Sequence, residues 1–138
     1  MVFDKYSKQL GFYVSLIVLL WAGSTSLYAA DRYFTASIDS KGQVMRQSPD
    51  WVGNVKHNPR TGYFSEYEVI LKAGVFERAP GFCSVSVTDV ESYDDLLFAH
   101  AKLAGTPTTR ALKVVTQVTG NSAKDVGTSK SFMLMCVR

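Results

Sequence analysis

The stretch CSVSVT, residues 83–88, decides the fold class, because apolar and polar side chains alternate along its whole length. A period of two residues places Cys83 and the two valines on one face of a β-strand and the two serines on the other. Strands with one apolar and one polar face are typical of antiparallel sheets that bury a single face. The stretch therefore predicts a strand with Cys83 pointing inward.

Similar short segments, separated by turn residues such as Gly, Pro, Asn and Asp, recur about every ten residues along the chain. This spacing is typical of β-sandwiches and jelly rolls. We therefore predict an all-β fold, an antiparallel and jelly-roll-like β-sandwich of about eight strands. The expected strands are residues 33–38, 43–47, 51–57, 63–71, 83–88, 96–103, 110–118 and 131–137.

The longest expected strand, residues 63–71, has one face that carries charge. Glu66 and Glu68 share this face, while Tyr67 lies on the other. We expect the glutamate face to be the solvated one. Residues 58–62 (NPRTG) precede this strand and predict a turn, because Pro presets one backbone dihedral angle and Gly accepts a left-handed conformation.

Residues 96–103 form the most ambiguous of these segments. They are apolar on both faces apart from His100 and Lys102, and their alanines also suit a short helix. We expect a strand here and leave a helix open as the alternative.

The first thirty residues have the three-part layout of a secretory signal peptide. A positively charged start with Lys5 and Lys8 precedes the uncharged run 11–22 (GFYVSLIVLLWA), and small and polar residues follow it as far as Ala30. We expect residues 1–30 to be removed on export and residues 31–138 to form the mature domain.

Two other interpretations of this first segment stay open. Residues 11–30 carry no charge and are long enough for an uncleaved membrane anchor, although a cluster of Ser and Thr interrupts the apolar run. Gly11-Phe12 also resembles a pilin processing site, although Leu16 stands where pilins carry Glu. We favour cleavage, which predicts a secreted or periplasmic protein with no membrane segment after cleavage.

The mature domain is nearly neutral, which bears on its partners. It has 13 basic and 11 acidic residues, and the basic ones are spread from Arg32 to Arg138 without clustering. Domains that bind nucleic acids concentrate positive charge on one face or along one stretch. We therefore expect no nucleic-acid partner.

Cys83 and Cys136 are the only cysteines of the chain, and each lies on the inward face of an alternating segment. Cysteines that occur in even number in exported proteins are normally paired. We therefore predict one disulfide between Cys83 and Cys136, with two separate buried thiols as the alternative. His57 and His100 are distant from both cysteines in the sequence, so we expect no metal site and no cofactor.

The candidate catalytic residues lack the neighbours that catalysis needs. Glu66 and Glu68 resemble the carboxylate pair of glycoside hydrolases, but the same pattern is typical of a solvated strand face. Neither His57 nor His100 has a nucleophile-elbow serine nearby. Trp51 follows a turn and is more typical of a core residue than of a sugar-stacking surface. We therefore expect a protein that is not an enzyme.

An acidic loop follows residues 83–88 and is the best candidate for a ligand contact. Asp94 and Asp95 directly follow the aromatic residue Tyr93, and these three are the candidate ligand-binding residues. Asp89, Glu91, Asp94 and Asp95 bring four carboxylates together, but their spacing matches no calcium-loop signature. A solvated loop is the alternative.

Part of the chain resembles known proteins. Residues 51–88 and the closing residues 131–136 (SFMLMC) are similar to small exported bacterial β-sandwich proteins of unknown role. Their order of a strand, Gly-x-Phe, Pro, a Val-rich strand and a last amphipathic strand also resembles H-type lectins and the receptor-binding tips of phage tail fibres. Those proteins are trimeric β-sandwiches that bind sugars. The resemblance covers about half of the mature chain and carries over no sugar-binding residue.

These features together predict an exported binding module. The expected ligand is cell-surface carbohydrate, and the resemblance implies a homotrimer. The alternative is a structural or inhibitor-like subunit of a periplasmic or surface assembly, which recognises a surface protein through an exposed strand edge or an aromatic loop.

Overall fold

The computed structural model describes residues 32–60, 62–88, 93–120 and 128–138. The predicted signal peptide lies outside the described residues, and so do Asp89 and Glu91 of the acidic loop. Within the described ranges, no helix is both long and apolar enough to cross a membrane.

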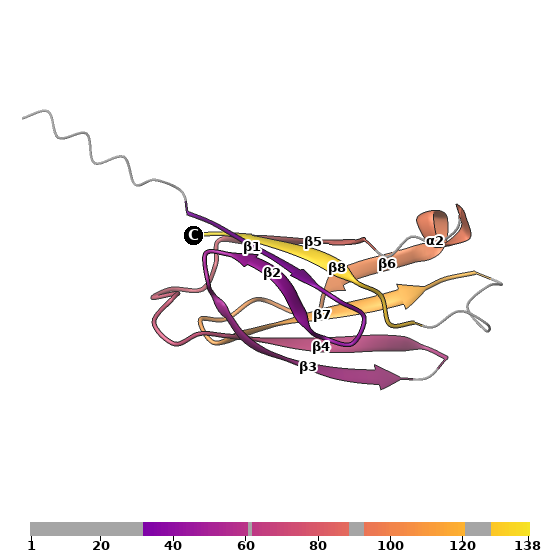
Figure 1. The fold of residues 1–138 in the computed structure, drawn as a ribbon, viewed down its shortest axis with the longest axis horizontal. Helices are drawn as coiled ribbons and strands as arrows, with labels where there is room; N and C mark the ends of the chain where they lie inside the picture. The colour runs from indigo at the N-terminus through magenta and orange to yellow at the C-terminus, as the bar shows by residue number, and fades with distance from the viewer. Residues whose placement is uncertain (1–31, 61, 89–92, 121–127) are drawn as a thin grey trace, which may run out of the picture. The chain divides into compact units, whose positions relative to one another are not determined.

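The described residues form two four-stranded antiparallel sheets and one short helix (Figure 1). The first sheet has the order β2-β1-β8-β5, made of β2 (Val44–Ser48), β1 (Tyr33–Ile38), β8 (Phe132–Val137) and β5 (Phe82–Val87). The second sheet has the order β3-β4-β7-β6, made of β3 (Val52–Arg60), β4 (Phe64–Leu71), β7 (Ala111–Val118) and β6 (Ala99–Leu103). Helix α2 (Tyr93–Phe98) leads into β6.

The chain passes repeatedly from one sheet to the other, after β2, β4, β5 and β7. Hairpins within a sheet join β1 to β2, β3 to β4 and β6 to β7. The prediction of an all-β antiparallel sandwich of eight strands with one disulfide is confirmed.

The core lies between the inner faces of the two sheets. On β4, Tyr67 and Val69 are fully buried, whereas Glu66 and Glu68 are partly exposed on the outer face. The predicted orientation of this strand is therefore confirmed. The core residues of the first sheet are Phe34, Ala36, Ile38, Phe132, Leu134 and Cys136, and those of the second are Val52, Tyr67, Val69, Leu71, Leu112 and Val114.

An aromatic cluster of Phe34, Trp51 and Phe76 fills the core near the passage from β2 to β3. The centroids of these three rings lie 4.5 to 5.9 Å apart. Trp51 is fully buried, and its indole N–H donates a hydrogen bond of 2.8 Å to the carbonyl oxygen of Thr35. Trp51 is thus a core residue, as the sequence indicated, and presents no surface to a sugar.

The side chain of Gln47 holds the passage from β2 to β3 in place. Its Oε1 accepts hydrogen bonds from the backbone N–H groups of Trp51 and Val52 at 2.9 and 2.7 Å. Its Nε2 donates to Asp50 at 2.9 Å. These bonds replace the ladder bonds that the backbone loses where it leaves the first sheet.

The predicted turn at residues 58–62 is wrong for residues 58–60, which belong to a strand. Strand β3 continues to Arg60, which pairs with Phe64 of β4. Proline is tolerated in β3 because this strand is at the edge of its sheet, where a missing N–H can face away from the ladder. Gly62, with a φ of +74°, lies in the tighter turn that results.

The segment 96–103 contains both structures that the sequence left open, because its first part is helical and its second part is a strand. Helix α2 ends at Phe98, and β6 begins at Ala99. The backbone N–H of Thr119 donates to the carbonyl oxygen of Phe98 at 2.9 Å, which joins the end of the helix to the end of β7. The strand part alternates as expected, with His100 and Lys102 exposed.

Cys83 and Cys136 form the predicted disulfide and lie directly opposite each other on β5 and β8. Cys136 is fully buried, and β5 is an edge strand of the first sheet. The two cysteines are 53 positions apart, so the bond closes a long loop that contains α2, β6 and β7. Restricting a loop of this length in the unfolded chain contributes about 4 kcal/mol to stability in the chain-entropy model.

We predict that Cys83→Ala and Cys136→Ala each lower the free energy of unfolding by about 2 to 5 kcal/mol, because either change opens the same loop. Cys136→Ala should have the larger effect, since it also removes a fully buried sulfur. The double variant should be only slightly less stable than Cys136→Ala alone, because the shared bond is lost once. Urea denaturation measures all three values.

Ser84→Ala, at an exposed position of the same strand, is the matched control and should stay within about 0.5 kcal/mol of the wild type. If the double variant loses the sum of the two single losses in free energy of unfolding, the two cysteines stabilise the domain independently, which would contradict the prediction.

Candidate functional site

The outer faces of the two sheets differ in charge. The outer face of the second sheet carries cross-strand ion pairs, Lys56 with Glu68 at 3.3 Å and Lys113 with Glu66 at 3.7 Å. Both glutamates therefore face lysines on neighbouring strands, which is the arrangement of a solvated sheet face. In the four strands of the first sheet, by contrast, Arg46 is the only charged residue.

The outer face of the first sheet combines apolar side chains with hydroxyl groups. Along β8, Met133 and Met135 point outward and are flanked on both neighbouring strands by small hydroxyl residues. Tyr33 and Phe82 are each 59% exposed at one end of this face. The rows across β1, β8 and β5 are Ser37-Met133-Ser86, Thr35-Met135-Ser84 and Tyr33-Val137-Phe82.

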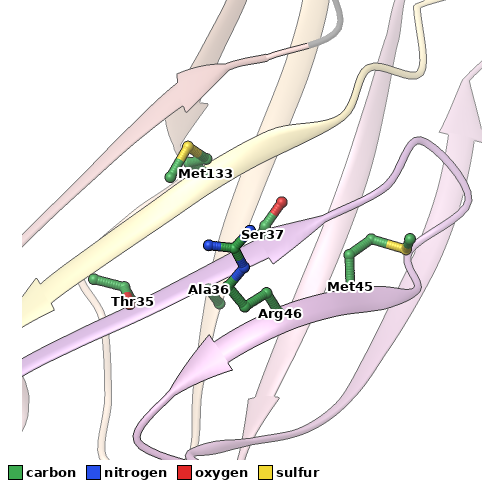
Figure 2. A pocket seen from close by; sticks show the side chains of 6 residues that line it. All are labelled: Thr35, Ala36, Ser37, Met45, Arg46 and Met133. Atoms are coloured by element: carbon green, nitrogen blue, oxygen red, sulfur yellow. The ribbon is translucent and has the colours of Figure 1, made fainter.

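A shallow hollow of about 490 Å³ lies on this outer face, over β1, β2 and β8. Figure 2 shows the guanidinium group of Arg46 above β1 and beside Ser37, with Met133 and Met45 on either side. We call this site the Arg46 hollow. Its lining residues are Thr35, Ala36, Ser37, Met45, Arg46 and Met133.

A β-bulge in β2 explains why two consecutive side chains are exposed here. Ser37 of β1 pairs with Arg46, but the next residue, Ile38, pairs with Val44, so Met45 is an extra residue in β2. Consecutive residues of a regular strand point to opposite faces, and a bulge changes the direction of one of them. Met45 and Arg46 are therefore both exposed, whereas Val44 packs against the core.

Among the described residues, none engages the hydrogen-bond donors of the Arg46 guanidinium group. Within the described ranges it has neither an ion pair nor a side-chain hydrogen bond. A guanidinium group carries five N–H donors in a planar fork. The hydroxyl of Ser37 can donate or accept beside it. The Arg46 hollow thus offers one positive charge, hydroxyl groups and two flexible apolar walls.

The predicted ligand-binding residues Tyr93, Asp94 and Asp95 lie on helix α2 and do not line the Arg46 hollow. Tyr93 is 85% exposed. The side chains of Asp94 and Asp95 lie outside the description, so a ligand contact at α2 stays a prediction. In the described part of the chain, no three His, Cys, Asp or Glu side chains are grouped to hold a metal ion.

A network of hydroxyl groups joins His57 to the segment that enters β8. Nε2 of His57 lies 3.0 Å from Oγ of Ser129, and this oxygen lies 2.7 Å from Oγ of Ser65. Thr128 extends the network to Ser65 at 3.1 Å. The sequence showed no nucleophile-elbow serine near His57, and it gave no sign of this contact, because residues 57 and 129 are far apart in the chain.

This network holds residues 128–129 against the second sheet. The ring of His57 stacks on Tyr67, with ring centroids 4.5 Å apart and an angle of 7° between the planes. Nδ1 of His57 has no hydrogen-bond partner among the described residues, so no third group orients the ring as in a catalytic triad. We therefore interpret the contact as structural.

The pKa of His57 is lowered from its ordinary value of 6.5, mainly because burial disfavours the charged ring. The negative charge of Asp39 partly opposes this effect. The neutral ring therefore predominates at pH 7, and Nε2 can accept the hydrogen bond from Ser129.

Comparison of the chain with protein-family models, with curated proteins and with solved structures found no match. The resemblance to H-type lectins and tail-fibre tips therefore stays a prediction.

We predict that stability falls between pH 7.5 and pH 5.5 through His57. Its pKa is lower in the folded chain, so the unfolded chain binds more protons below about pH 6.5. The stability that the neutral ring contributes is fully present above about pH 6.5 and is lost as the pH falls through the folded-state pKa. Thermal denaturation of His57→Gln should show a smaller decrease in Tm over this range than the wild type.

His100→Gln, at an exposed position on β6, is the matched control and should keep the wild-type decrease. An unchanged decrease in Tm for His57→Gln would show that other groups cause the pH dependence.

Proposed function

We propose that this protein is an exported carbohydrate-binding module and that the Arg46 hollow is its binding site. One observation supports this most strongly. The hollow brings hydroxyl groups, apolar walls and a guanidinium group that has no partner among the described residues together on a sheet whose four strands hold no other charged residue. Such a site combines donors for sugar hydroxyls with surfaces for the C–H groups of a sugar ring.

The size of the hollow suits a small ligand. The hollow of about 490 Å³ lies within the range of roughly 300 to 1,000 Å³ that is usual for small-ligand sites.

A second function is supported by the residue types on the same face. Aromatic residues, Met and Arg are enriched in protein interfaces, whereas Lys, Glu and Asp are depleted. Tyr33, Phe82 and Met133 are exposed here, and no Lys, Glu or Asp is found in the four strands. The second proposal is therefore a structural or inhibitor-like subunit that makes a weak contact with a surface protein.

The disulfide is compatible with an oxidising compartment, in line with a secreted or periplasmic location. We propose binding without catalysis. A homotrimer is the proposed assembly, and sedimentation velocity of the purified protein measures it.

We predict that the purified protein binds to a glycan array and that Ser37→Tyr weakens this binding at least tenfold. The tyrosine ring would occupy the hollow, because Ser37 lines it between Met133 and Arg46. Ser86→Tyr is the matched control, since it adds the same ring in the same row of the outer face but outside the hollow. This variant should bind as the wild type does.

Binding of no glycan by the wild type would contradict the carbohydrate proposal, as would equal losses in the two tyrosine variants. Capture of one surface protein in a fixed ratio, abolished by Met133→Glu, would instead support the second proposal.

A further inference from the structure

We propose that the Arg46 hollow selects a sugar that bears a carboxylate, such as a uronic or sialic acid. This inference rests on the proposed function, because it names the class of carbohydrate that the site takes. It is carried by the charge of the hollow, by the position of Arg46 and by the groups around it.

Arg46 differs from two lysines of the second sheet in its charged neighbours. Lys56 and Lys113 pair with Glu68 and Glu66 on neighbouring strands. Arg46 has no carboxylate partner within the described ranges. Opposite charges that face each other across strands stabilise a sheet. A ligand that supplies a carboxylate would complete this pair.

The nearest acidic residues in the sequence are already engaged. Asp50 forms an ion pair with Lys72 and accepts a hydrogen bond from Gln47. Asp39 accepts hydrogen bonds from the backbone N–H groups of Lys41 and Gln43 at 2.9 and 2.7 Å. Neither carboxylate therefore neutralises Arg46.

The geometry of the guanidinium group suits a carboxylate. Its planar fork can donate two parallel hydrogen bonds to the two oxygens of one carboxylate, and such charge-assisted bonds are about twice as strong as neutral ones. The β-bulge at Met45 sets this group above β1, where Figure 2 shows it beside Ser37. The hydroxyl of Ser37 can then bind a neighbouring oxygen of the same sugar.

The count of charges favours a singly charged group. The four strands of the first sheet carry one positive charge and no other charged residue. A carboxylate neutralises this charge, whereas a phosphate group carries about −1.5 to −2 at pH 7 and would leave an excess of negative charge. Met45 and Met133 can adapt to the ring that carries the carboxylate, because the Met side chain is unbranched and flexible.

The experiment uses a glycan array in which each carboxylate-bearing glycan is present both as the free acid and as its methyl ester. Esterification removes the negative charge and leaves the sugar skeleton intact. We expect the purified protein to bind the free acids at least tenfold more tightly than the esters. Arg46→Gln should abolish this preference, and Arg46→Lys should restore only part of it, because lysine keeps the charge without the fork.

Arg60→Gln removes a positive charge from the exposed end of β3 in the second sheet and is the matched control. It should keep the full preference for the free acids. Circular dichroism and the Tm of each variant show that the fold is retained.

Equal binding of acids and esters, or an unchanged preference in Arg46→Gln, would overturn this inference while carbohydrate binding itself stands. Stronger binding to sulfated or phosphorylated glycans than to the free acids would also overturn it. Binding to no glycan at all would overturn the proposed function and this inference together.

Discussion

Strand β8 must satisfy two environments at once, and the rest of the domain depends on this constraint. It lies between β1 and β5, and its side chains alternate between the core and the outer face. Leu134 and Cys136 pack inside the sandwich, while Met133 and Met135 point outward. The Cys83–Cys136 disulfide then holds edge strand β5 to this central strand.

Most of the fold could be predicted from the sequence, because the alternation of apolar and polar residues along a strand indicates which face is buried. The segments around Cys83, Tyr67 and Cys136 each alternate with a period of two, and each has the predicted face inside. The segment at residues 96–103 could not be resolved, because its helical and extended halves are both rich in apolar residues.

The candidate site was harder to predict than the fold. The Arg46 hollow depends on the bulge at Met45, and a bulge is a property of the pairing between β1 and β2. Nothing in the sequence of either strand alone reveals that pairing. The available signal was that Arg46 is the only charged residue in the first-sheet strands, which becomes visible once the strand order is known. Likewise, the contact between His57 and Ser129 joins distant parts of the chain.

The two outer faces have different roles in this interpretation. On the second sheet, Lys56 and Lys113 pair with Glu68 and Glu66 across neighbouring strands. The first sheet leaves one arginine and several apolar side chains in contact with water. The pairing of β1 with β2 and β8 fixes the backbone beneath the hollow, so ligand contacts can form there without rearrangement of the core.

The proposed site requires that β8 presents its methionines to solvent while its other face is buried. Oxidation of the folded protein by hydrogen peroxide, followed by mass spectrometry, tests this directly. The structure predicts that Met133 and Met45 are oxidised at rates close to those of the urea-unfolded chain, because both are more than half exposed. Strong protection of Met133 in the folded protein would show that this face of β8 is buried, and would contradict the arrangement on which the proposed site depends.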